Sequence, residues 1–361
     1  MKKFLFLSLI SILLILSACK KDPEIMDTQD SAFSAVLNNY GPKITGQYGD
    51  LKSETTLLLA RANDFLSSEA IEDFLLVQEQ LKICRKQWFN VSMFDFGPAF
   101  NLDLRLSINT FPIDTAAVAN LVNESPIINP ANDEKGFLAI EWILHRDNAF
   151  ELLTDGINDE QEAAALIWYC NDINSLINAV HDAWQNGYES NFINNTGASA
   201  GSGMSLLVNN YIQDYERLKR QRVALPLGLL TLGIPLNSHV ESPYAGYSAE
   251  LMNSQMASSI LYFQGWDQSV ENSYGLDDAI KSVNATWGEE STPLELVILQ
   301  RYSDAQVALN SLSDPFQIQI EEDPETVETV YNALQSVVPL IKADMPSALG
   351  ISITFADNDG D

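Results

Sequence analysis

The chain is poor in basic residues. Its 361 residues include 20 Lys and Arg against 49 Asp and Glu, which gives a formal net charge of −29 at pH 7. So acidic a surface repels phosphate backbones, and no basic stripe offsets this repulsion. We therefore expect no nucleic-acid partner. Metal ions, basic peptides and other cationic partners are compatible with the negative charge of the protein.

Cysteine and histidine are also scarce, with three of each. Cysteine clusters with metal-binding spacing are missing, as are the His-Glu-x-x-His and Gly-x-Ser-x-Gly signatures of common hydrolases. Cys84 and Cys170 both lie in apolar helical patterns, so two buried free thiols and a disulfide are both compatible with the sequence. We predict no catalytic residue.

A short apolar run opens the chain. Two lysines precede residues 4–16, and Leu16-Ser17-Ala18-Cys19 follows, a pattern typical of lipoprotein signal peptides. The run is shorter than the roughly 20 apolar residues of a membrane-spanning helix. We predict a signal peptide over 1–18, then an acylated Cys19 with a flexible tether over 19–35. The acyl chains would make the membrane a partner; the alternative is a buried N-terminal helix.

Helical periodicity dominates the mature chain. Apolar residues recur at a period of 3.6 over residues 68–88, 159–185 and 203–222. Alternation with period two is confined to the short stretches 316–320 and 351–355. The pattern predicts an all-α fold.

Two later helices carry start signals. Thr292-Pro293-Leu294-Glu295 combines a capping Thr with a Pro and a Glu in the first turn, and Asp323-Pro324 offers a second capping residue followed by Pro. We expect Thr292 and Asp323 to cap the helices that follow them.

The length fits two domains or one large domain, at roughly 100–200 residues each. The Gly- and Ser-rich stretch Asn194–Gly203 is the best candidate for a hinge. We predict two helical-bundle domains packed against each other, at 36–195 and 196–346, followed by an acidic tail at 347–361.

A long apolar loop is expected at Val223–Leu236, because Pro226, Gly228, Gly233 and Pro235 interrupt regular structure there. Exposed apolar patches are unfavourable. We therefore expect this loop to be buried at a domain contact or to line a pocket.

One acidic residue lies in an almost wholly apolar helix. Glu141 stands within Lys135–Leu144, where burial of an unpaired carboxylate costs several kcal/mol or shifts its pKa. It therefore needs a partner. Arg85, Arg105 and His145 are the candidates, and His145 lies one helical turn along the same face.

Together these stretches resemble the imelysin family, also classified as peptidase family M75. Residues 136–141 stand where the family has its hallmark Gly-x-His-x-x-Glu, and the similarity spans residues 36–361. The other matching segments are Cys84–Trp88, Phe96–Phe100, Asp103–Arg105, Phe111–Asp114, Leu232–Leu236, Val240–Tyr244, Tyr247–Ser248 and 350–361. The resemblance implies an exported protein of a Gram-negative bacterium, often a lipoprotein, with two helical-bundle domains.

The hallmark histidine is replaced by Leu138. A His and a Glu three positions apart share a helix face and can bind a metal such as Zn²⁺, but Leu138 has no lone pair to donate. His145 could substitute from the other side of Glu141, or it is a structural or solvated histidine. The cofactor stays unknown, with a divalent metal as the one candidate and no metal ligand assigned.

The second matching loop supplies further candidates. We expect Glu241, Ser242 and Ser248 to face Glu141 across the domain contact, and the alternative for the serines is helix capping. A structural or ligand-facing role for Glu141 is favoured over that of a general base. The ligand-binding candidates are Glu141, Gly136, Arg105, His145, Glu241, Ser242 and Ser248.

Three functions are compatible with this sequence. The first is a non-catalytic binding lipoprotein of the cell envelope, anchored at the outer membrane, with a ligand cleft between two helical domains. The family's association with iron-responsive uptake implies a metal, haem or peptide ligand and envelope uptake partners. The second is an M75-type metallopeptidase, against which Leu138 argues. The third is a structural subunit of an envelope complex.

Overall fold

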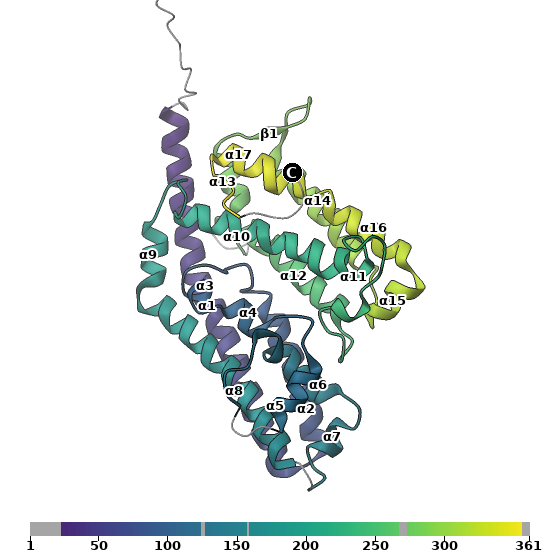
Figure 1. Cartoon of the computed structure of the whole chain (residues 1–361). Coiled ribbons are helices and arrows are strands. Elements are labelled where there is room, and N and C mark those ends of the chain that lie inside the picture. Colours follow the sequence, from purple (N-terminus) through teal and green to yellow (C-terminus); the bar gives the residue numbers. More distant parts are fainter. Residues whose placement is uncertain (1–22, 124–126, 157–158, 267–272, 356–361) are drawn as a thin grey trace, which may run out of the picture.

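The computed structural model describes residues 23–123, 127–156, 159–266 and 273–355 (Figure 1). The predicted signal peptide, Cys19 and residues 356–361 of the predicted acidic tail lie outside these residues. Residues 23–35, predicted as part of a flexible tether, belong instead to a helix that begins at Pro23. In the described residues the regular secondary structure is helical apart from one pair of two-residue strands, so the all-α prediction is confirmed. No helix in this part of the chain is long and apolar enough to cross a membrane.

A single long helix, α1 (Pro23–Ser68), runs along the N-terminal half and continues beside helices of the C-terminal half (Figure 1). Its buried apolar and aromatic side chains recur at helical spacing and so form one stripe, with the buried Thr55 between Leu51 and Leu58. The stripe consists of Val36, Tyr40, Ile44, Tyr48, Leu51, Leu58, Ala62 and Phe65. Against α1 pack α2 (Ile71–Trp88) and α8 (Asp159–Ala183), the helices predicted at 68–88 and 159–185.

Five short helices lie between α2 and α8 in the sequence. They are α3 (Pro98–Asn101), α4 (Leu104–Ile108), α5 (Thr115–Val122), α6 (Phe137–His145) and α7 (Ala149–Leu152), with the 3-10 turn η1 (Asn132–Glu134) before α6. Helix α6 packs against both α2 and α8, and nearly all of its side chains are buried. The apolar helix that contains Glu141 is therefore part of the core.

The chain bends sharply after α8. The π-helical turn η2 (Trp184–Tyr188) contains Gly187 with a φ of +124°, a conformation that favours glycine, and α9 (Glu189–Asn194) continues beyond the bend. The predicted hinge then forms an irregular turn up to α10 (Gly203–Arg217). Its last residue, Ser202, caps α10 by accepting a hydrogen bond from Ser205 N at 3.2 Å.

The C-terminal half is a second group of helices, drawn green to yellow in Figure 1. It comprises η3 (Leu218–Ala224, π-helical), α11 (Leu225–Leu227), η4 (Asn237–His239), α12 (Ser248–Phe263), α13 (Leu276–Ser282), α14 (Leu294–Leu309), α15 (Phe316–Glu322), α16 (Pro324–Gln335), η5 (Leu340–Asp344) and α17 (Met345–Leu349). Asp323 caps α16 as expected, because its carboxylate accepts from Thr326 N at 3.2 Å.

One local prediction is wrong. Thr292 caps no helix: Thr292–Pro293 (β2) pairs antiparallel with Thr286–Trp287 (β1), and α14 begins afterwards. The two stretches that alternate with period two form no strand. Residues 316–320 form α15, where the buried residues recur at helical spacing, and residues 351–355 are irregular.

The apolar loop at 223–236 is only partly buried. Its first residues lie in η3 and α11, but the following turn exposes Leu229, Leu230, Leu232 and Ile234. Gly228, at a φ of +92°, allows this turn, and its carbonyl accepts from Gly233 N at 2.9 Å. The turn closes on its own backbone, so its side chains point outward and the expected burial is wrong for this tip.

The two halves share one core. Helix α10 packs against α1, and α12 packs against both α2 and α10. The buried apolar side chains form a single cluster that runs from Phe33 to Ile351. The division into two domains at 195 and 196 therefore stays a prediction, although a helix boundary lies close to it.

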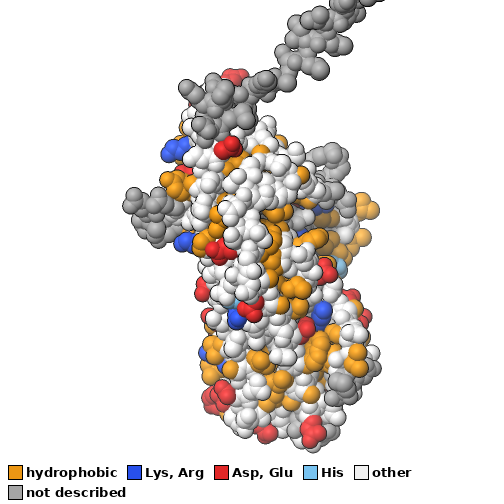
Figure 2. All heavy atoms as spheres, turned by 90° about the vertical axis from the view of Figure 1, so that its left-hand side faces the viewer, with side chains coloured by type: hydrophobic (Ala, Val, Ile, Leu, Met, Phe, Trp, Pro, Cys, Tyr) orange, Lys and Arg blue, Asp and Glu red, His pale blue; other side chains and the backbone are white. Residues whose placement is uncertain are grey.

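Acidic side chains are spread over the surface. On the face that Figure 2 presents, Asp and Glu side chains are scattered from one end of the molecule to the other, with Lys and Arg isolated among them. This distribution agrees with the net charge of −29.

Replacing Phe65 by Ala tests the buried stripe of α1. The Phe65 ring is fully buried, with its centroid 5.2 Å from that of Phe74 and 6.1 Å from that of Phe150. We expect Phe65→Ala to lower the free energy of unfolding by about 3–5 kcal/mol in urea denaturation. The control Leu232→Ala, at the exposed tip, should change it by less than about 0.5 kcal/mol. Equal losses in the two variants would contradict this assignment of the core.

Candidate functional site

Gly136 sets the position of α6. Its φ of +87° lies in the left-handed region, and a Cβ at this position would be 2.6 Å from the carbonyl oxygen of Ile108. Only glycine therefore lets the start of α6 lie directly against the end of α4. The structure places Gly136, one of the ligand-binding candidates, in a structural contact that positions the helix of Glu141.

Glu141 is fully buried between the two halves of the chain, and both of its carboxylate oxygens are occupied. Arg85 of α2 forms an ion pair with Oε2, and the hydroxyl of Ser242 donates to the same oxygen at 2.9 Å. The backbone N–H groups of Tyr244 and Ala245 donate to Oε1, each at 3.1 Å. Of the three expected partners, Arg85 is therefore the one that pairs with Glu141.

Arg85 extends this pair into a network. Its Nη2 donates to the carbonyl oxygen of Glu241 at 2.5 Å and lies 3.5 Å from the Glu241 carboxylate. The Glu241 carboxylate also accepts a hydrogen bond from Asn109 Nδ2 at 2.8 Å, and it lies 2.8 Å from Arg222 Nε. The four charged side chains are each no more than 1 % exposed. We call Arg85, Glu141, Arg222 and Glu241 the buried network.

Ser242 and Ser248 order the loop that meets Glu141. Ser242 contacts Glu141 directly, and its backbone N–H donates to the Ser248 hydroxyl at 2.9 Å. Helix capping, the alternative for these serines, is carried out by Asp314, which accepts from the N–H groups of Ala249 and Glu250 at 2.8 and 3.1 Å. Glu241, Ser242 and Ser248 therefore lie together beside Glu141.

Arg105 does not reach Glu141. Its Nη2 lies 2.8 Å from Asp214 Oδ1, and its Nε lies 3.0 Å from Asp95 Oδ2. The expectation that Arg105 pairs with Glu141 is therefore wrong. Arg105 is held by two other carboxylates, because α4 presents it toward α10 rather than toward α6.

Asp214 is a second buried carboxylate that the sequence analysis missed. Ser92 Oγ donates to it at 3.1 Å and Gln255 Nε2 at 2.7 Å. Burial alone would raise the pKa of Asp214, but the nearby guanidinium groups of Arg105 and Arg222 outweigh burial and hold that pKa below its usual range. A signal existed: Asp214 interrupts the apolar face that α10 forms at helical spacing.

His145 stands apart from the carboxylate. It is half-buried at the end of α6, and its Nε2 has no hydrogen-bond partner in the described chain. Burial lowers the pKa of His145, and although Glu141 opposes this shift, Arg85 adds to it. This shift favours the neutral imidazole over its protonated form.

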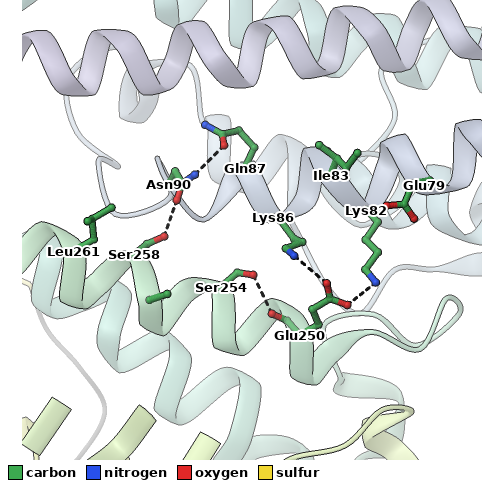
Figure 3. Close-up of a pocket in the computed structure, with 11 residues that line it drawn as sticks. Glu79, Lys82, Ile83, Lys86, Gln87, Asn90, Glu250, Ser254, Ser258 and Leu261 are labelled. Carbon is green, nitrogen blue, oxygen red and sulfur yellow. Dashed lines mark hydrogen bonds and ion pairs between the residues drawn. The ribbon is translucent and has the colours of Figure 1, made fainter. Parts of the chain in front are cut away.

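An open groove lies beside the buried network. It has a volume of about 640 Å³ and separates α2 from α12 (Figure 3). Glu250 lies between the ammonium groups of Lys82 and Lys86 and is 2.9 Å from the latter. Ser258 donates to Asn90 at 2.7 Å across the groove. These five side chains belong to both halves of the chain.

The imelysin profile, peptidase M75, matches residues 44–343. The chain belongs to the imelysin family. No curated protein matches the sequence.

Two solved structures share the fold. The imelysin-like protein from Psychrobacter arcticum 273-4 has a TM-score of 0.73 at 19% identity, and the alignment covers 90% of this chain and 98% of that one. A protein of Parabacteroides distasonis ATCC 8503, described as a putative iron-regulated protein A precursor, has a TM-score of 0.73 at 18% identity, covering 92% and 97%. At these identities the likeness shows the imelysin-like fold alone.

The metal that the imelysin hallmark implies does not fit the residues present here. Leu138, at the histidine position, is fully buried in the core. Both oxygens of Glu141 face groups that carry hydrogens, which would have to leave before a cation could bind. Within the described residues, no three His, Cys, Asp or Glu side chains are grouped so as to hold a metal ion. Cys84 and Cys170 are buried free thiols.

Replacing Glu141 by Gln tests the buried network. The variant leaves the guanidinium of Arg85 buried without its carboxylate, so we expect the free energy of unfolding to fall by about 3–5 kcal/mol. The matched control is Glu250→Gln, whose carboxylate is 38% exposed beside Lys82 and Lys86. Urea denaturation should show a loss below about 1 kcal/mol in this control. Losses of similar size in both variants would argue against a stabilising role for the buried pair.

The depressed pKa of Asp214 predicts that the free energy of unfolding decreases in acid. Because its pKa is depressed in the folded state, its stabilising contribution is complete above the unfolded-state pKa of about 3.9 and is lost as the pH falls through the lower folded-state value. We expect the urea concentration at the unfolding midpoint to decrease when the pH is lowered below about 4. The decrease should be smaller in Asp214→Asn. The exposed Asp304→Asn variant should keep the wild-type pH dependence. An unchanged pH dependence in Asp214→Asn would refute this assignment.

Proposed function

We propose that this imelysin-family protein is a non-catalytic binding protein of the cell envelope that contributes to iron uptake. Its ligand occupies the groove between α2 and α12. The observation that carries the proposal is this groove, which lies between side chains of both halves and beside a network that holds the two halves in place. Pockets of about 300–1,000 Å³ are typical of small-molecule sites.

The state of Glu141 supports binding rather than peptidase activity. A general base needs a lone pair within reach of the proton that it removes. The lone pairs of Glu141 already accept hydrogen bonds from Ser242, Tyr244 and Ala245, and its charge is paired with Arg85. The carboxylate is therefore used to hold the loop, and we favour binding over the M75-type metallopeptidase.

The lining of the groove supports an amphipathic organic ligand with acidic groups. Figure 3 places Leu261 toward one end of the groove and Lys82 with Lys86 toward the other. Apolar surface suits a carbon skeleton, and lysine ammonium groups suit carboxylates. Both ammonium groups pair with Glu250 in the structure, so a ligand carboxylate would take the place of Glu250 beside them. Haem combines these properties. The link to iron and to export is supported by the structural neighbour described as an iron-regulated protein A precursor.

The N-terminal segment supports the location. Residues 1–18 have the features of a lipoprotein signal peptide, and an acylated Cys19 would anchor the protein in the outer membrane of a Gram-negative bacterium. Partners in uptake are then proteins of the same envelope.

A structural subunit of an envelope complex is the second candidate. One observation favours it: Leu229, Leu230, Leu232 and Ile234 are exposed together on a short turn. Exposed apolar side chains that are contiguous often mark contacts with other proteins. In this case the groove would be incidental to the function.

Haem titration of the mature chain tests the proposed function. We expect saturable binding, followed by the Soret absorbance, and a loss of affinity of about tenfold or more in Ala257→Trp, which fills the groove from an exposed position on α12. Ala116→Trp, on an exposed position of α5, should bind like wild type. Absence of haem binding, or equal affinity in the two variants, would contradict the proposal. So would zinc-dependent peptide cleavage that Glu141→Gln abolishes.

A further inference from the structure

A second cavity, of about 330 Å³, opens between α4 and the π-helical turn η3. Its polar lining comes chiefly from Arg105, Asn109, Arg217 and Arg222, and its apolar wall includes Phe111. No acidic side chain lines it. Three of the chain's 20 basic residues thus meet at one small cavity, although the protein as a whole is strongly acidic. We call this cavity the arginine pocket.

The π-helical turn explains how two of these arginines meet. Arg217 ends α10, and Arg222 follows five positions later in η3. An α-helix points residues five positions apart in different directions, whereas the i→i+5 hydrogen bonding of a π-helix brings them onto one side. Widened turns of this kind are frequent at functional sites. Arg105 then reaches the same cavity from α4 of the other half.

The guanidinium groups of Arg217 and Arg222 are incompletely satisfied. Arg105 Nε and Arg217 Nη2 share a single oxygen of Asp95, at 3.0 and 3.3 Å. Nη1 of Arg217 and Nη1 of Arg222 are buried and have no hydrogen-bond partner among the described residues, and Arg222 as a whole is 1 % exposed. Buried N–H groups without acceptors are costly, and both residues line the pocket, so an acceptor that enters it and reaches these two donors would remove that cost.

The electrostatic surroundings favour an added anion. Burial, with repulsion from Arg105, lowers the pKa of Arg217 to about 9. Burial also lowers the pKa of Arg222, although Glu241 and Asp214 oppose the shift. These carboxylates contact the arginines without lining the pocket. A negative group placed in the pocket would therefore relieve repulsion among the arginines.

We propose that the arginine pocket binds a small organic anion that carries carboxylate groups. Guanidinium groups match carboxylates as bidentate donors. Phe111, Leu106 and Leu225 offer apolar contacts that suit a carbon skeleton better than an inorganic anion. Asn109 Oδ1, which has no hydrogen-bond partner in the described chain, is free to accept from a hydroxyl group on the same molecule. The ligand class is thus that of hydroxylated di- and tricarboxylates.

This site is separate from the groove between α2 and α12, and the two sites share no lining residue. The inference therefore does not depend on the proposed function. Failure of haem binding would leave it intact, and failure of anion binding would leave the groove intact.

Isothermal titration of the mature chain with citrate tests the proposal. We expect binding with a Kd at least about tenfold lower than that of inorganic phosphate at equal ionic strength. Arg217→Gln should weaken citrate binding by about tenfold or more. The matched control Arg301→Gln removes the same charge from a half-exposed position on α14 and should leave the Kd unchanged.

Gln221 offers a second variant that spares the buried arginines, because it lines the pocket from an exposed position. Gln221→Glu should weaken citrate binding and Gln221→Lys should strengthen it, with circular dichroism confirming that both fold. Absence of citrate binding, or citrate affinity unaffected by Arg217→Gln and by both Gln221 variants, would overturn the proposal. If phosphate binds as tightly as citrate, the pocket has no preference for an organic carboxylate, and the proposed ligand class would be overturned in favour of an inorganic oxyanion.

Discussion

A carboxylate or a guanidinium loses several kcal/mol of favourable hydration when it is buried. Glu141 and Arg85 are both buried, and the structure compensates with their ion pair and with donors from Ser242, Tyr244 and Ala245. Arg85 and Glu141 both belong to the N-terminal half, whereas the loop belongs to the C-terminal half. The part of the compensation that the loop donors supply therefore lasts only while the two halves stay in contact.

This arrangement gives the imelysin hallmark a different use. With Leu138 in place of histidine, the helix that would supply a metal ligand supplies core packing instead, and Glu141 accepts hydrogen bonds rather than binding a cation. The basic side chains that line cavities lie to either side of Glu141 instead. Lys82 and Lys86 of α2 line the groove, and Arg105, Arg217 and Arg222 line the arginine pocket. Ligand binding in the groove or in the arginine pocket agrees better with this arrangement than hydrolysis at Glu141, whose carboxylate oxygens already accept hydrogen bonds.

Sequence patterns predicted those parts of the site in which a residue differs in polarity from its neighbours along the chain. Glu141 stood out among apolar neighbours, and the periodicity predicted α2, α8 and α10. The sequence could not show that Glu141 pairs with Arg85 rather than with Arg105. Both are basic residues in helices far from α6 along the chain, and only the packing of these helices decides which side chain faces Glu141. Asp214 and Arg222 were missed since their partners lie far along the chain. The loop tip at Leu232 was misjudged because its glycine turn closes on its own backbone.

A double-mutant cycle on Arg85 and Glu141 tests most directly whether their pairing, at the centre of the buried network, stabilises the fold. Urea denaturation of Arg85→Met, Glu141→Gln and the double variant yields the coupling energy. The account predicts that the double variant loses less stability than the sum of the single variants, by about 1.5–3 kcal/mol, because removing both partners leaves no unpaired buried charge. Additive losses, within about 0.5 kcal/mol, would contradict it.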